Sequence, residues 1–152
     1  MATTSSKSGE VINILLLGET GVGKSTFVNA FYNYITFRTL DEAIEQKDLH
    51  YVIGSEFAYS DNDYKVTKIK IGGEICDLNE VPASQGQSQT QSAKAHEFVV
   101  NDTRVRIIDT PGIGDTRGLE KDKENFKQTI KYISQFEHLN AICILLKPND
   151  KR

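Results

Sequence analysis

A glycine-rich run early in the chain has the composition and spacing of a phosphate-binding loop. Residues 18–25 read GETGVGKS, which fits the pattern G-x-x-x-x-G-K-[S/T]. The backbone N–H groups of such a loop point at phosphate oxygens, and the helix that follows adds its positive N-terminal end. The pattern assigns Lys24 to the β- and γ-phosphates, with a catalytic role, and the Ser25 hydroxyl to Mg²⁺. We expect the remaining residues of the run to line the same site: Gly18, Glu19, Thr20, Gly21, Val22, Gly23 and Thr26.

The residues on either side of this run occur in the order that a phosphate loop requires. Residues 11–17 (VINILLL) are a short apolar stretch, typical of a buried parallel strand, and residues 26–35 (TFVNAFYNYI) are typical of a helix. A chance glycine-rich turn after a strand is the alternative, and the strand–loop–helix order argues against it. The sequence therefore predicts that a polyphosphate binds where the first strand ends.

A second strand, far downstream, ends in an acid. Residues 105–109 (VRIID) run directly into TPGIGDT. If this strand lies parallel to the first and close to it, Asp109 and Ser25 face one Mg²⁺ from two sides, with Asp109 in the second coordination shell. Gly112 then offers a backbone N–H to the γ-phosphate with no side chain in the way. The alternative is an Asp-Thr-Pro-Gly turn that only closes a strand.

A polar stretch precedes this second strand. Residues 83–92 (ASQGQSQTQS) contain too little apolar surface to bury themselves. We expect a bound nucleotide to order the stretch, with one of its hydroxyls completing the Mg²⁺ shell only while the γ-phosphate is present. Thr90 is the preferred residue for this metal-binding and catalytic role, and Ser88 and Ser92 are alternatives. A solvated polar linker is the other interpretation.

The strand patterns predict an α/β fold. Two alternating runs, 96–100 and 103–108, are joined by Asn101 and Asp102, a pair suited to a tight hairpin turn. Residues 141–146 (AICILL) are apolar without alternation, as in a strand buried on both faces. Together the patterns predict a three-layer P-loop NTPase fold with a mainly parallel sheet and one antiparallel strand.

Residues 119–139 predict an amphipathic helix. Phe126, Ile130 and Ile133 recur at helical spacing on one side, with lysine and glutamate on the other. We expect the side that carries these three apolar residues to cover the sheet.

Residues 38–82 have the least regular pattern and are treated as an insert. Residues 41–46 predict a helix. Residues 64–71 alternate as an edge strand would, with lysines that protect the edge from further pairing, and Gly72 ends the run.

Length and composition are those of one ordinary domain. The chain has 152 residues, of which 38% are hydrophobic and 26% charged. The net charge of −3 gives no general reason to bind nucleic acid or an anionic membrane surface. No window approaches 18 consecutive apolar residues, so we expect no membrane segment.

The chain carries no recognisable targeting signal. Residues 1–9 lack an apolar signal core and predict a disordered tail, and Ala2 stands where myristoylation requires glycine. Cys76 and Cys143 are far apart in sequence, which favours buried free thiols over a disulfide. These features indicate a cytoplasmic location.

Taken together, GETGVGKST, the Ser-Gln-Thr loop and DTPGIGDT resemble the septin-related branch of the translation-factor class of GTPases, nearest to the immunity-associated (AIG-type) GTPases and the septins. The resemblance covers about residues 10–147 and is poor over 38–82. It implies GTP or GDP as the ligand and Mg²⁺ as the cofactor. A phosphate loop alone would also fit an ATPase, whose second strand more often ends in a pair of acids. The resemblance to these GTPases implies roles for individual positions. It assigns the phosphates to Gly21, Gly23, Lys24, Ser25 and Thr26, the switch threonine to Thr90, and the metal and the γ-phosphate to Asp109 and Gly112.

The sequence departs from the wider GTPase pattern at two places. Ile113 stands where small signalling GTPases carry the glutamine that orients the attacking water, so we expect slow intrinsic hydrolysis. The resemblance implies that related proteins supply the missing group from a homodimer partner across the nucleotide face, or keep the nucleotide as a structural element. A guanine-binding Asn/Thr-Lys-x-Asp motif is absent, since residues 149–152 (NDKR) contain similar residues in a different order.

From this absence we expect residues 10–152 to be a partial G domain that is incomplete at its C-terminal end. Guanine nucleotide remains the expected ligand, and a low-activity Mg²⁺-dependent GTPase the expected function. Three alternatives stay open: a nucleotide-dependent assembly module with little turnover, an ATPase of similar fold, and an inactive fragment.

Overall fold

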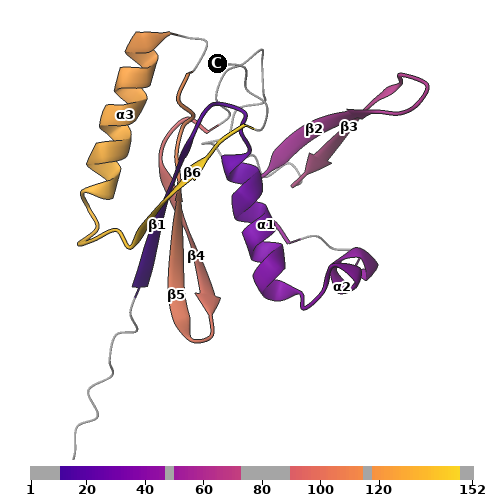
Figure 1. The fold of residues 1–152 in the computed structure, drawn as a ribbon, viewed down its shortest axis with the longest axis horizontal. Helices are drawn as coiled ribbons and strands as arrows, with labels where there is room; N and C mark the ends of the chain where they lie inside the picture. Colours follow the sequence, from indigo (N-terminus) through magenta and orange to yellow (C-terminus); the bar gives the residue numbers. More distant parts are fainter. Residues whose placement is uncertain (1–10, 47–49, 73–89, 115–117, 148–152) are drawn as a thin grey trace, which may run out of the picture.

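The chain folds into an α/β structure with one main sheet and a small separate hairpin (Figure 1). The computed structural model describes residues 11–46, 50–72, 90–114 and 118–147. In chain order the elements are β1 (Val11–Gly18), α1 (Lys24–Thr36), α2 (Leu40–Glu45), β2 (Ser55–Ser60), β3 (Val66–Ile71), β4 (Lys94–Val100), β5 (Thr103–Asp109), α3 (Leu119–Ile133) and β6 (Ala141–Leu145).

The main sheet has the strand order β4-β5-β1-β6. Strand β1 lies at its centre and pairs in parallel with both β5 and β6, while β4 is antiparallel to β5. The turn between β4 and β5 places Asn101 and Asp102 at φ values of 47° and 64°, the left-handed conformation that a two-residue hairpin turn needs. The predicted hairpin, and the prediction of a mainly parallel sheet with one antiparallel strand, are confirmed.

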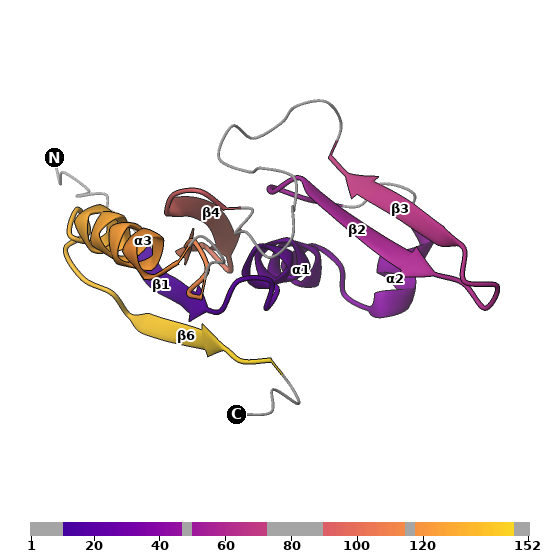
Figure 2. The same cartoon turned by 90° about the horizontal axis from the view of Figure 1, so that it is seen from above.

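One helix covers each face of the main sheet. Successive residues of β1 point to opposite faces, so Leu16 joins an apolar cluster with Val28 of α1, and Leu15 joins another with Ile108. Residues from the C-terminal part of α3 and beyond pack against the second cluster. Both views show α1 and α3 on opposite sides of the sheet (Figures 1 and 2).

The prediction of which side of α3 faces the sheet was wrong in part. Phe126 is 61% exposed and Ile130 46% exposed, whereas Asn125 and Thr129 are buried. Ile133 does pack against the sheet, but its companions are aromatic residues of the same region, Tyr132 and Phe136. The contacts of Tyr132, Ile133 and Phe136 with this cluster define the rotation of the helix and leave Phe126 on its exposed side.

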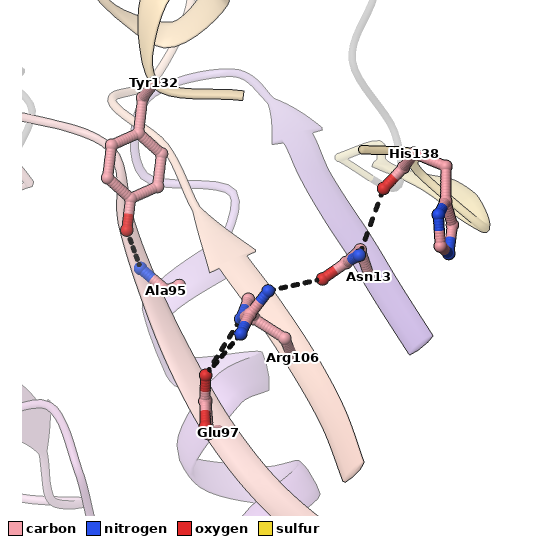
Figure 3. A network of polar contacts seen from close by, with 6 residues as sticks. All are labelled: Asn13, Ala95, Glu97, Arg106, Tyr132 and His138. Atoms are coloured by element: carbon pink, nitrogen blue, oxygen red, sulfur yellow. Dashed lines mark hydrogen bonds and ion pairs between the residues drawn. The ribbon is translucent and has the colours of Figure 1, made fainter. Parts of the chain in front are cut away.

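Polar contacts that run across the strands accompany this arrangement (Figure 3). The backbone N–H of Ala95 donates to the Tyr132 hydroxyl at 3.0 Å. Arg106 donates to the Glu97 carboxylate and to the Asn13 side-chain carbonyl, and its guanidinium lies 4.8 Å from the centre of the Phe136 ring. The network links β1, β4, β5 and α3, so it holds in register the strands that end at the glycine-rich loop.

Strand β6 is covered on one face only. Cys143 and Leu145 pack against the α1 side of the core, while Ile142, Ile144 and Leu146 are exposed. The prediction that both faces of this strand are buried was therefore wrong, because none of the described helices lies over the other face.

The insert forms a helix and a hairpin instead of an edge of the main sheet. The expected helix is confirmed as α2, which Thr39 caps by accepting the N–H of Glu42. Strand β3 pairs with β2, a strand that the sequence did not reveal, in a separate two-stranded sheet beyond α1 (Figure 2). The segment before β2 is tied to α1 because the Asn29 side chain binds backbone groups of Val52 and Ile53.

Several predictions concern residues outside the described ranges. These are the tail at 1–9, Cys76, Ser88 with the rest of 83–89, and the residues at 149–152. Within the described part, Cys143 is a free thiol that is only partly buried. The longest described helix, α3, has 15 residues, and no helix in that part of the chain could span a bilayer.

Candidate functional site

The glycine-rich loop leads from the end of β1 into α1. Gly23 has a φ of 100°, a left-handed conformation that a side chain would disfavour, and it caps the helix. The helix begins at Lys24, two residues earlier than the expected start at Thr26. Its first internal bond runs from the N–H of Phe27 to the carbonyl of Gly23, so the amides before Phe27 precede the helix's own hydrogen-bond ladder. Amides in this position can bind an anion.

Lys24 lies at the centre of this loop and is buried. Its Nζ donates to the carbonyl oxygens of Gly18 at 3.0 Å and Glu19 at 3.1 Å. Burial lowers the pKa of Lys24, the negative charge of Asp109 opposes that shift, and the charge of Lys147 adds to it. A buried ammonium bonded only to neutral carbonyls is stabilised by a nearby anion, and a phosphate would supply one.

Three oxygen-bearing side chains meet beside Lys24. The Ser25 hydroxyl donates to Asp109 Oδ2 at 2.8 Å, and the Thr90 hydroxyl donates to the same oxygen at 3.3 Å. The two hydroxyl oxygens are 3.1 Å apart. The parallel pairing of β1 with β5 brings Ser25 and Asp109 together, because the carboxyl ends of both strands lie at one edge of the sheet. Thr90 reaches the same edge because it precedes β4, whose first residue pairs with Asp109. The structure thus brings together residues that lie 19 to 84 positions apart in sequence.

The donor set of this cluster suits Mg²⁺. Magnesium prefers oxygen ligands at about 2.1 Å in octahedral geometry, so adjacent ligands lie about 3.0 Å apart. The hydroxyl oxygens of Ser25 and Thr90, 3.1 Å apart, have the spacing of two adjacent ligands, and Asp109 accepts a hydrogen bond from each. Within the described residues no group of three His, Cys, Asp or Glu side chains could hold a metal ion. A metal here would therefore depend on the two hydroxyls, with Asp109 behind them, and on the oxygens of a ligand.

The Asp109 carboxyl is buried, with 1% of the residue exposed. Burial raises its pKa, against the hydrogen bonds from Ser25, Thr90 and the Thr110 backbone and against the charge of Lys24. The Thr110 hydroxyl, which the sequence analysis missed, donates to the carbonyl of Leu16 at 2.7 Å and ties the end of β5 to β1. A buried carboxyl group is costly to ionise, and a cation beside it stabilises the ionised form.

The segment after β5 lies directly on the glycine-rich loop. The N–H of Thr20 donates to Ile113 at 2.9 Å, and the N–H of Ile113 donates to Gly18 at 3.1 Å. A Cβ atom on Gly112 would lie 2.4 Å from Thr20 Cα, so no side chain fits there. The Thr20 hydroxyl oxygen is buried against this glycine and has no hydrogen-bond partner in the described part of the chain. The geometry therefore accounts for the glycine at position 112.

The Gly112→Ala variant is expected to lower the free energy of unfolding by at least about 2 kcal/mol, because its methyl group meets backbone atoms that cannot move aside. Gly114→Ala is the matched control. It meets no atom within 4 Å and carries only the strain of its φ of 76°, about 1 kcal/mol. Urea unfolding measures both variants. Equal losses of stability would mean that Gly112 does not need to lie against the loop.

The comparisons with known proteins show a distant likeness to a curated protein. No family model matches the chain. The structure is of the α/β class, and part of the chain is distantly similar to a GTP-binding protein. That protein is GTP-binding protein A of Dictyostelium discoideum, with 25% identity over 122 residues. The alignment covers 80% of this chain but 17% of the Dictyostelium protein.

Proposed function

We propose that the chain binds guanine nucleotide with Mg²⁺ and hydrolyses it slowly, and that the γ-phosphate orders the loop containing Thr90. The observation that carries the proposal is the convergence of Lys24, Ser25, Thr90 and Asp109 at the adjacent carboxyl ends of β1 and β5. The likeness to a protein named for GTP binding supports the choice of nucleotide.

Each residue has a distinct task in this proposal. Lys24 exchanges its two carbonyl partners for phosphate oxygens, and the loop amides donate to the same group. When bound, Mg²⁺ neutralises charge on the β- and γ-phosphates. Ser25 and Thr90 present hydroxyl oxygens to it, and Asp109 keeps them in place by accepting from both.

Slow hydrolysis follows from the residue after Gly112. Ile113 has an apolar side chain that is exposed, and two backbone hydrogen bonds hold it to the loop. Such a side chain cannot orient a water molecule for attack. In this proposal a second copy of the chain supplies that group across the nucleotide face. A nucleotide-dependent assembly module with little turnover is the second candidate, and the same side chain favours it.

A titration of mant-GTP and mant-ATP, with Mg²⁺ and with EDTA, tests the proposal. We expect Mg²⁺-dependent binding that is stronger for the guanine nucleotide. The same affinity for both bases would keep the polyphosphate site but remove guanine from the proposal, and no binding of either nucleotide would overturn it. Phosphate release at rising protein concentration separates the two candidates, because a group supplied by a second copy makes the rate rise faster than linearly.

The Thr90→Ala variant is expected to weaken the Mg²⁺ complex of GTP about tenfold and that of GDP less than about twofold, because its hydroxyl is needed only while the γ-phosphate is present. Competition against a mant-nucleotide measures both affinities. Ser92→Ala, which removes the rival hydroxyl, is the control and should leave the ratio of the two affinities unchanged. Equal weakening of both complexes by Thr90→Ala would take the switch role away from this threonine.

A further inference from the structure

Lys147 lies beside the glycine-rich loop, on the flank opposite the Ser25, Thr90 and Asp109 cluster. Strand β6 pairs with β1 as far as Gly18 and Leu145, and a Cβ atom on Gly18 would lie 2.6 Å from the carbonyl oxygen of Leu145. The two backbones are thus in contact where the loop begins, and Lys147 follows two residues later. In α/β sheets ligands bind outside the carboxyl ends of the strands, which is where Lys147 lies.

The described partner of Lys147 is an acidic residue of the loop itself. Its Nζ is 3.7 Å from the Glu19 carboxylate, and the two side chains are 43% and 49% exposed. An exposed pair at this distance contributes little stability, so it is easily exchanged for a stronger anion. The charge of Lys147 also reaches Lys24, where it adds to the lowering of the pKa of that ammonium. Two neighbouring cations repel one another, and an anion between them stabilises both.

We propose that Lys147 is a second cation of the nucleotide site and binds the phosphate farthest from the metal, next to the nucleoside. The strand order β5-β1-β6 carries this inference. It puts the Asp109 cluster on one flank of the loop, Lys24 at its centre and Lys147 on the other flank. A phosphate chain that begins at Mg²⁺ and crosses the loop ends beside Lys147. The inference rests on the proposed function and adds a residue that the sequence analysis missed.

The position of Lys147 sets its effect apart from that of Thr90. The phosphate next to the nucleoside is present in GDP and in GTP, so loss of Lys147 weakens both complexes equally. Glu19 has the opposite charge and repels the phosphates, so removing its charge strengthens both complexes. An Arg at position 147 keeps the charge and most of the affinity.

Affinities of four variants for mant-GDP and mant-GTP test the inference: Lys147→Gln, Lys147→Arg, Glu19→Gln and the double variant Glu19→Gln/Lys147→Gln. We expect Lys147→Gln to weaken both complexes about fivefold and Glu19→Gln to strengthen both. The double variant should bind about threefold more weakly than Glu19→Gln alone. Without the Glu19 charge, replacing Lys147 removes only its attraction to the phosphate. Lys131→Gln, a charge loss on the exposed side of α3, should change neither affinity.

Two results would overturn the inference. If the double variant binds as tightly as Glu19→Gln, Lys147 only neutralises the glutamate and does not touch phosphate. If Lys147→Gln weakens GTP alone, the lysine lies at the γ-phosphate instead. These failures leave the proposed function standing, provided that Lys24→Ala still abolishes binding. Absence of nucleotide binding by the wild-type chain would overturn both proposals.

Discussion

Replacement of Lys24 by alanine is expected to lower the affinity for Mg²⁺-GTP at least about 30-fold. The ammonium is buried at the centre of the loop, and its partners there are the carbonyls of Gly18 and Glu19. Removing one member of a buried, hydrogen-bonded charge pair costs roughly 2–5 kcal/mol, which is a factor of about 30 to several thousand in affinity. Isothermal titration with GTP at constant Mg²⁺ measures the loss.

A second variant separates lost binding from lost folding. Lys24→Met keeps most of the side-chain volume and removes a charge that burial disfavours, as the lowered pKa of Lys24 shows. Its free energy of unfolding should therefore stay close to that of the wild type while nucleotide binding is lost. Binding of wild-type strength in either variant would remove Lys24 from the site and defeat the proposed function.

Mg²⁺ is expected to raise the affinity for GTP, and in the Asp109→Asn variant this increase should be about 10- to 100-fold smaller. The same variant should be more stable than the wild type without ligand. Because burial raises the pKa of Asp109, the folded chain holds this proton more tightly than the unfolded chain. The wild type therefore loses stability as the pH rises from the usual carboxyl range through the raised pKa.

Urea unfolding at several pH values, beside Mg²⁺ titrations of the GTP complex, tests both parts of this prediction. The stability advantage of Asp109→Asn should grow with pH and then level off, since asparagine does not titrate. Asp102→Asn, at the exposed hairpin turn, is the control and should change neither quantity by much. An unchanged Mg²⁺ dependence in Asp109→Asn would place the metal elsewhere.

The arrangement around the glycine-rich loop was predictable because local order determines it. An apolar strand, a loop of fixed spacing and a helix follow one another directly, so the position of Lys24 depends on no distant contact. Asp109 needed one assumption, that β5 lies parallel to β1, and the pairing of these strands fulfils it. Thr90 needed the hairpin as well, because it lies just before β4, whose first residue pairs with Asp109. Asn101 and Asp102 predicted the neighbouring hairpin by their turn chemistry alone.

The features that could not be predicted depend on tertiary packing. Two apolar stripes run along α3 and its C-terminal extension, and the sequence gives no means to rank Phe126 and Ile130 against Tyr132 and Phe136. The exposure of Ile144 depends on what covers β6, which no pattern within that strand encodes. Lys147 was missed because it belongs to no motif, although it follows a strand that lies beside the loop strand.

The most direct test of a metal-bound nucleotide at this site is electron paramagnetic resonance of Mn²⁺, used in place of Mg²⁺, with the wild-type chain and GDP. We expect a signal of protein-bound Mn²⁺ that requires chain and nucleotide together and is lost in the Lys24→Ala variant. A Mn²⁺ signal that is the same whether or not the chain is added to the nucleotide would contradict it.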